Sequence, residues 1–258
     1  MRPLRPTAAT LAAVCGLWWT GACGSTSTDD QALTGQPSTS MARAASPPTA
    51  ARTVPPPSTG PEPALRPGTD GCDHRRPPRP SVVRSYLTPP PLVLPPGSTA
   101  YSVRLDTSCG PVVIAPDQQG GDATDAFAAL AERRFYDGLS FFRVVPGYFV
   151  QGGDPENTGA GGPGFTVRGS KPPSGTVFKL GDVAMAKTRP QPEGTAGSQF
   201  LVVTGAAAAR SVSPIYAIVG HVTDVASLAT LRRLDALGVG DGPPLRSLYI
   251  WRARITSG

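Results

Sequence analysis

Residues 141–164 read FFRVVPGYFVQGGDPENTGAGGPG, and residues 159–164 within this stretch fit the pattern GxGxxG. This pattern is typical of dinucleotide-binding loops, in which a strand leads into the loop and a helix begins directly after it. The residues that follow, 165–173, have no helical periodicity and end in Pro172-Pro173, which would stop a helix. We therefore interpret the glycines as an irregular loop that uses positive φ angles, and not as a phosphate cradle.

Residues 1–22 have the layout of an export signal. A basic start precedes an apolar run over 8–19, which is shorter than the ~20 residues that span a bilayer. Small residues then precede Cys23, an order that resembles a bacterial lipoprotein cleavage site, with Thr20 where such sites usually carry Leu. We expect export, with a lipid on Cys23 that anchors the protein to the outer face of the cytoplasmic membrane. Ordinary secretion is the alternative.

Residues 23–98 have the composition of a tether. Seventeen of the chain's 31 prolines lie between Pro37 and Pro96, and Tyr86 is the one aromatic residue of this span. Such a segment buries too little apolar area to offset the entropy of ordering. We expect a mostly disordered, partly extended tether, which either holds a domain away from a membrane or is a linker without a length requirement.

Two of the four cysteines are left to pair with each other if the N-terminal assignment holds. Cys15 is removed with the signal and Cys23 carries lipid, which leaves Cys72 in the tether and Cys109 in the folded region. An oxidising compartment favours the pairing of two such thiols. We expect a Cys72–Cys109 disulfide that fastens the tether to the domain, and two free thiols are the alternative.

The charge pattern argues against nucleic acid as a partner. The formal net charge is +6, from 24 basic and 18 acidic residues. Removal of Arg2 and Arg5 with the signal leaves 22 basic against 18 acidic residues, or +4. The basic residues are scattered along the chain, whereas nucleic-acid-binding proteins concentrate them on one face.

Residues 99–258 have the pattern of one β-rich domain. Apolar runs and alternations predict strands over 101–106, 111–114, 139–145, 147–152, 182–187, 198–204, 215–223 and 248–255. Helical spacing of apolar residues predicts helices over 125–134 and 224–237. Many strands with two helices favour a closed barrel with helical caps, because closure removes exposed sheet edges.

A second stretch, VAMAKTRPQPEGTAGSQFLVVTG at 183–205, joins the first in pointing to a family. Together they resemble the cyclophilins, peptidyl-prolyl cis-trans isomerases whose motifs read roughly FHRVIPGFMxQGGD, then a GTGGxG loop, then LAMAN and GSQFFI. The resemblance covers about 101–255. It implies a mainly β fold, an eight-stranded antiparallel barrel capped by two helices, and an isomerase without cofactor or metal. We expect a monomer that binds proline-containing segments of exported proteins.

The resemblance also implies a site. Arg143 matches the catalytic arginine and Gln151 the glutamine that positions it. The residues that match the proline pocket and the substrate-pairing segment are Tyr148, Phe149, Ala186, Lys187, Gln199, Leu201 and Tyr216. Taken singly, each would be an ordinary core or surface residue, and only their joint spacing supports a site.

The chemistry of the reaction fits these residue types. Rotation about the Xaa-Pro bond sacrifices amide resonance and crosses a barrier of about 18–20 kcal/mol. A catalyst must hold the proline ring and stabilise the twisted amide better than the planar one. An apolar floor suits the ring, and Arg offers rigid, always-protonated donors for the amide.

The sequence departs from the family pattern at several positions. Phe142 replaces a His before Arg143, Leu201 replaces an aromatic pocket wall, and segment 204–214 lacks the tryptophan associated with tight cyclosporin binding. Two function classes follow. One is an exported prolyl isomerase in protein folding, which Arg143 and Gln151 favour. The other is a module, such as a chaperone or adhesin, that binds proline-containing segments without catalysis, which Leu201 favours.

Overall fold

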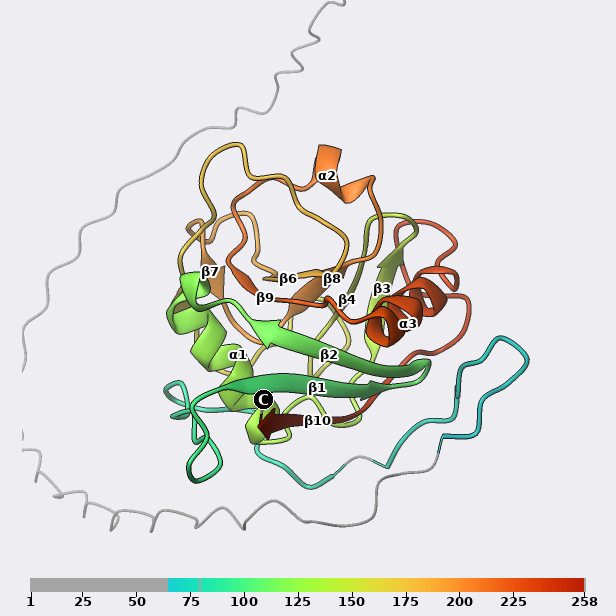
Figure 1. The fold of residues 1–258 in the computed structure, drawn as a ribbon, viewed down its shortest axis with the longest axis horizontal. Coiled ribbons are helices and arrows are strands. Elements are labelled where there is room, and N and C mark those ends of the chain that lie inside the picture. The colour runs from blue at the N-terminus through green and yellow to red at the C-terminus, as the bar shows by residue number, and fades with distance from the viewer. Residues whose placement is uncertain (1–64, 79, 258) are drawn as a thin grey trace, which may run out of the picture. The chain divides into compact units, whose positions relative to one another are not determined.

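The computed structural model describes residues 65–78 and 80–257. The predicted signal, Cys23 and the tether up to residue 64 therefore lie outside the described residues. Within the described part, no helix is both long and apolar enough to cross a membrane. Residues 65–78 and 80–98 form no regular helix or strand and precede a β-rich domain over 101–257 (Figure 1).

Eight strands form one curled antiparallel sheet. They are β1 (Tyr101–Thr107), β2 (Gly110–Pro116), β3 (Phe141–Val145), β4 (Phe149–Gly152), β6 (Asp182–Met185), β8 (Phe200–Val203), β9 (Ile218–His221) and β10 (Ile250–Ser257). Their order in the sheet is β10-β1-β2-β9-β6-β8-β4-β3 (Figure 1). Each strand overlaps one of the predicted ranges. The elements too short for a periodic signal were not predicted: η1 (Gln118–Gly120), β5 (Val167–Arg168), β7 (Thr195–Ala196) and α2 (Ala208–Ser211).

The outer strands of this order, β3 and β10, meet through a short seam. Ser140 and Tyr249 form an isolated antiparallel bridge. Beside it, the backbone N–H of Phe141 donates to the carbonyl of Leu248 at 2.9 Å. The predicted eight-stranded antiparallel barrel is confirmed, and isolated hydrogen bonds rather than a regular ladder close it.

Two main helices lie against the barrel on opposite sides (Figure 1): α1 (Asp122–Glu132) and α3 (Val225–Asp235). They confirm the helices predicted over 125–134 and 224–237, with shifted ends. Gly121, at φ 58°, ends η1 and lets α1 begin at Asp122, whose carboxylate suits the positive end of a helix. The side chain of Asp224 caps the first turn of α3.

Aromatic side chains fill the interior of the barrel. The ring centroid of Phe200 lies 5.3 Å from that of Phe127, 5.4 Å from Tyr136 and 6.3 Å from Phe141, in edge-to-face arrangements. All four side chains are fully buried. The interior is therefore a packed core, and a ligand must bind to the outer surface of the sheet.

Residues 65–78 and 80–98, which we call the strap, pack on the barrel without forming helix or strand. The structure joins Cys72 to Cys109, in the turn between β1 and β2, by a disulfide. Both cysteines and Asp73 are buried. The backbone N–H of Asp73 donates to the carbonyl of Ser108 at 2.7 Å, next to the disulfide.

The far end of the strap is fixed as well. Arg84 donates from its guanidinium to the carbonyls of Phe135 and Asp137. The backbone N–H of Tyr86 donates to the carbonyl of Pro163 at 2.8 Å, and its ring packs against the core. The described part of the predicted tether is thus held on the barrel rather than free, because neighbours satisfy its polar groups.

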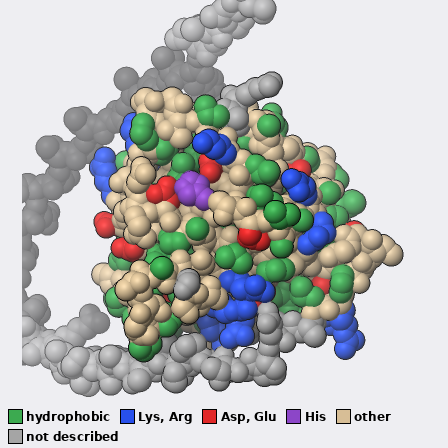
Figure 2. All heavy atoms as spheres, viewed as in Figure 1, with side chains coloured by type: hydrophobic (Ala, Val, Ile, Leu, Met, Phe, Trp, Pro, Cys, Tyr) green, Lys and Arg blue, Asp and Glu red, His purple; other side chains and the backbone are tan. Residues whose placement is uncertain are grey.

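Charged side chains are spread over the molecule. Figure 2 shows Lys and Arg side chains from one edge of the drawn face to the other, with acidic side chains between them. Several are paired, for example Lys171 with Glu193, and Arg104 and Arg254 with Asp106. The arrangement on this face matches the scattered pattern of the sequence.

Candidate active site

The sheet register places Arg143 in a row with Gln151 and Leu201. Arg143 of β3 is paired with Gln151 of β4, and Gln151 is paired with Leu201 of β8. The Nη1 of Arg143 donates to Oε1 of Gln151 at 3.1 Å. The two residues predicted as catalytic are therefore direct neighbours, on adjacent strands.

The strands that carry this row have two apolar faces. Val150 and Phe200 belong to the large interior cluster. Of the residues next to them on the same strands, Leu201 belongs to a second cluster on the outer side, and Phe149 packs against that cluster, as Tyr216 does. Because successive side chains of a strand point to opposite faces, the same short strands build the core and the floor of a surface site.

A cavity of about 250 Å³, which we call the arginine cavity, lies over this outer cluster. Its lining residues are Arg143, Phe149, Gln151, Ala186, Lys187, Leu201, Ser211, Val212, Ser213, Ile215 and Tyr216. Its floor is apolar, and Arg143 and Gln151 provide donors at its rim. Seven of these eleven residues were predicted as site residues; Ser211, Val212, Ser213 and Ile215 were not.

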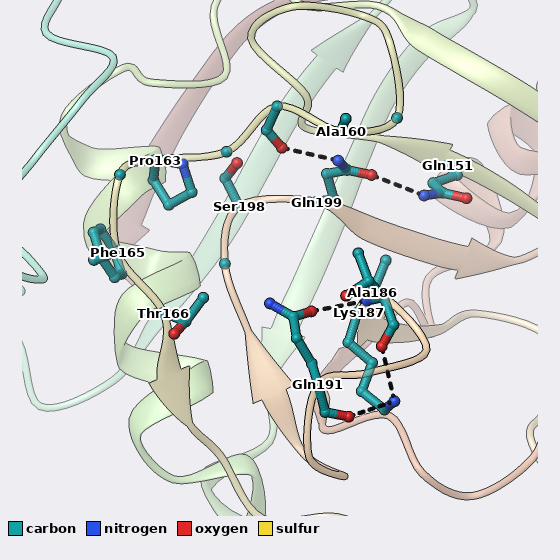
Figure 3. Close-up of a pocket in the computed structure, with 16 residues that line it drawn as sticks. Gln151, Ala160, Pro163, Phe165, Thr166, Ala186, Lys187, Gln191, Ser198 and Gln199 are labelled. Atoms are coloured by element: carbon teal, nitrogen blue, oxygen red, sulfur yellow. Dashed lines mark hydrogen bonds between the residues drawn. The ribbon is translucent and has the colours of Figure 1, made fainter. Parts of the chain in front are cut away.

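A second cavity of about 430 Å³, which we call the glycine-loop cavity, adjoins the first and shares Gln151, Ala186 and Lys187 with it (Figure 3). Figure 3 shows Gln199 between Gln151 and the glycine loop. The Nε2 of Gln151 donates to Oε1 of Gln199 at 3.0 Å, and the Nε2 of Gln199 donates to the carbonyl of Gly161 at 2.9 Å. A polar chain therefore connects the arginine to the loop.

The glycine loop has a carboxylate at its centre. Asp154, which is fully buried, accepts hydrogen bonds from the backbone N–H groups of Glu156 at 2.7 Å, Thr158 at 2.9 Å and Gly159 at 2.6 Å. Within the GxGxxG stretch, the N–H groups of Gly159 and Gly161 thus point inward to the Asp154 carboxyl group and are not open to a phosphate. The prediction that this GxGxxG stretch is not a nucleotide loop agrees with this geometry.

Arg143 has a further partner that the sequence did not predict. Its Nε donates to Oδ1 of Asp241 at 2.5 Å, and its Nη2 donates to Oδ2 at 2.8 Å. Asp241 raises the pKa of Arg143 further above its ordinary value, and Arg143 holds the pKa of Asp241 below its usual range. Asp241 lies 98 residues away in a glycine-rich loop, where no local pattern singles it out.

The remaining predicted residues differ in what they offer. The backbone N–H of Ala186 donates to the carbonyl of Gln199 at 2.8 Å, so a ligand could use only its carbonyl. The ammonium of Lys187 donates to the carbonyl of Gln191 at 3.0 Å and closes its own loop. Tyr148, expected at the proline pocket, lies in the turn between β3 and β4 and lines neither of the two cavities.

The arginine cavity therefore combines an apolar floor with a fixed, partly buried cation. This chemistry suits an apolar ring that is bonded to a polar amide. Among the described residues, no group of three or more His, Cys, Asp or Glu side chains could hold a metal ion. Arg143 and Gln151 are the donors of this lining that are bonded to each other, and Ser211, Ser213, Tyr216 and Lys187 also line the cavity with polar groups.

Comparisons with known proteins agree on one family. Residues 103–255 match the family model described as cyclophilin type peptidyl-prolyl cis-trans isomerase/CLD. Peptidyl-prolyl cis-trans isomerase B of Bacillus subtilis is 43% identical over 77 residues, which are 30% of this chain and 52% of that protein. Probable peptidyl-prolyl cis-trans isomerase A of Mycobacterium leprae is 41% identical over 90 residues, covering 35% and 47%.

The chain thus spans about half the length of the curated relatives that it matches. Among solved structures, a Cryptosporidium parvum cyclophilin type peptidyl-prolyl cis-trans isomerase superposes with a TM-score of 0.53 at 26% identity. That match covers 61% of this chain and 98% of the other. Since the family model covers more than half of the 258 residues, the protein belongs to the cyclophilin-type peptidyl-prolyl cis-trans isomerase family.

Proposed function

We propose that this protein catalyses the cis-trans isomerisation of Xaa-Pro peptide bonds. One observation carries the proposal: Arg143 is held by Gln151 at the rim of an apolar cavity, on strands whose register fixes both residues. Family membership supports the same activity.

The cavity supplies what the reaction needs. The proline ring lies on the apolar floor, against Phe149 and Leu201. As the amide twists, its nitrogen regains a lone pair, and the guanidinium of Arg143 donates to the twisted amide more strongly than to the planar one. A single donor of this kind typically contributes about 10²–10³ in rate. No covalent intermediate is required.

The path of the rest of the substrate peptide is suggested by the residues that the two cavities share. Gln151, Ala186 and Lys187 border both cavities. A peptide whose proline occupies the arginine cavity passes these residues and extends toward the glycine loop. The carbonyl of Ala186 can accept a backbone N–H of such a peptide, because only its own N–H is already used.

The proposed setting is outside the cytoplasm, where the protein assists the folding of exported polypeptides. The order of residues 1–23 supports export with lipidation of Cys23. The Cys72–Cys109 disulfide supports an oxidising compartment. Replacement of Cys23 by Ala should release the processed chain from membranes. If the Cys23→Ala chain still fractionates with membranes after signal cleavage, lipid anchoring is wrong.

The activity is tested by a protease-coupled assay on a proline-containing tetrapeptide, with melting temperature measured on the same samples. Arg143→Ala should lose about 10²–10³ in kcat/KM and keep its melting temperature, since the side chain is partly exposed. Arg143→Lys should also fail, because an ammonium cannot reproduce the fork geometry. Full activity of Arg143→Ala would refute the assignment. Peptide binding without turnover by the unaltered chain would favour the non-catalytic binding module.

A further inference from the structure

The Asp241 carboxylate holds one whole edge of the Arg143 guanidinium. Its two oxygens accept from Nε at 2.5 Å and from Nη2 at 2.8 Å, the side-on bidentate arrangement. Gln151 holds the third nitrogen, Nη1, at 3.1 Å. The plane of the guanidinium is thereby fixed from two sides, while its carbon lies 5.0 Å from the centre of the Phe149 ring.

The position of Asp241 is set by the backbone of its loop. The N–H of Val144, next to Arg143 on β3, donates to the carbonyl of Gly242 at 2.8 Å. The loop is closed by the N–H of Leu245, which donates to the carbonyl of Leu237 at 2.8 Å. A Cβ at Gly238 would come within 2.7 Å of Val144, so the loop approaches β3 closely. Asp241 is therefore presented to Arg143 by main-chain contacts.

This ion pair contributes little to the stability of the fold. The side chain of Arg143 is 37% exposed and that of Asp241 is 61% exposed. Exposed pairs are screened by water and are worth little in free energy of unfolding. The bidentate contact therefore matters mainly for the orientation of the Arg143 guanidinium.

The pair leaves Arg143 able to act. A guanidinium has five N–H groups, and the bonds to Asp241 and Gln151 use three of them. One N–H on Nη1 and one on Nη2 remain for a substrate. Asp241 and Gln151 fix the direction in which these two N–H groups point. Arg143 therefore loses less side-chain entropy on donating to the twisted amide than an arginine without these partners would.

We infer that Asp241 is a positioning residue, which orients the Arg143 guanidinium toward the arginine cavity for the isomerisation of Xaa-Pro bonds. The inference rests on the proposed function. In this role Asp241 does not contact the substrate. It affects the rate only by orienting Arg143.

A double-mutant cycle in the full-length chain tests this role. Asp241→Ala should lower kcat by about 10-fold, as the loss of a supporting partner typically does, with KM almost unchanged. In an Arg143→Ala background the same substitution should change nothing further. Asp241→Asn, which keeps one acceptor of the same shape, should recover part of the rate. Asp125→Asn, the same charge change at an exposed position of α1, should keep the unaltered rate.

A second readout does not depend on activity. The Nε–H of Arg143 should give a distinct NMR signal protected from solvent exchange in the unaltered chain, and this protection should disappear in Asp241→Ala. The inference is overturned if Asp241→Ala keeps the full rate, gains rate, or loses the same factor with and without Arg143. Failure of the proposed function is separate: there, Arg143→Ala alone would keep full activity, whatever happens at Asp241.

Discussion

The two faces of strands β4 and β8 carry two hydrophobic clusters with different surroundings. On the inner face, Phe200 is fully buried among other aromatic rings. On the outer face, its neighbour Leu201 is 5% exposed and forms part of the floor of the arginine cavity. Substitutions at adjacent residues of one strand should therefore separate stability from substrate binding.

The largest effect is expected on the inner face. Phe200→Ala removes a ring that contacts Phe127, Tyr136 and Phe141 and leaves a cavity in a closed core. We expect the free energy of unfolding to fall by about 3–5 kcal/mol, measured by urea denaturation. A loss below about 1 kcal/mol, which is what a volume-conserving swap between apolar residues costs, would mean that the interior is not packed as described.

Removal of the disulfide between the strap and the barrel tests whether a segment outside the barrel stabilises the fold. Cys72 and Cys109 are 37 residues apart, and cross-links of this kind typically stabilise a protein by about 2–4 kcal/mol. Replacement of both cysteines by Ser should lower the free energy of unfolding by that amount, while kcat at a temperature where the chain is folded stays the same. A large loss of kcat in the folded variant would show that the strap shapes the site.

The outer face should respond in binding more than in folding. Leu201→Ala removes part of the cavity floor, which this largely buried side chain lines. We expect kcat/KM to fall by about 10-fold, mainly through KM, since a small change in an apolar pocket is worth about 1–3 kcal/mol. Stability should fall by less than in Phe200→Ala. Equal losses of stability in both variants would erase the distinction between the two faces.

The smallest effect on stability is expected from the ion pair between Asp73 and Arg75 in the strap. Arg75 donates to Asp73 and lowers the pKa of that carboxyl from 3.8 to about 2. The stabilisation from this pair is therefore present above pH 3.8 and is lost as the pH falls toward about 2. Arg75 also lies over the ring of Trp251, at 5.6 Å.

Fluorescence of Trp251 reports this loss, because it is the one tryptophan outside residues 1–22. Its emission should change over this acid range before the barrel unfolds, as followed by far-ultraviolet circular dichroism. Asp73→Asn should abolish the early change. An identical early transition in Asp73→Asn would assign it to another carboxyl group.

The regular part of the fold could be predicted from the sequence because period and composition carry it. Strand alternation located all eight strands of the main sheet, and apolar spacing located α1 and α3. Proline content predicted a mostly disordered, partly extended tether over 23–98, and the described residues of the strap contain no helix or strand. It did not predict that the strap packs on the barrel, because the contacts of Arg84 and Tyr86 are made with carbonyls distant in sequence.

The site was predictable where a motif lies on strands. Arg143 and Gln151 come together because their hairpin register is local. Asp241 escaped prediction because its approach to β3 depends on a backbone contact between Val144 and Gly242, which no periodic pattern encodes. Tyr148 was placed at the pocket by resemblance alone, and here it lies in the hairpin turn.

The central claim is that an Xaa-Pro bond is isomerised on the outer face of the sheet beside Arg143. Two-dimensional exchange NMR of an Ala-Pro peptide, with a substoichiometric amount of the full-length chain, measures this directly. The account predicts cis-trans exchange cross-peaks that appear with the unaltered chain and vanish with Arg143→Ala. The NMR signals of the Phe200 ring and the core around it should be the same in both chains, which would show that both are folded. Absence of exchange with the unaltered chain, or exchange that persists in Arg143→Ala, would contradict it.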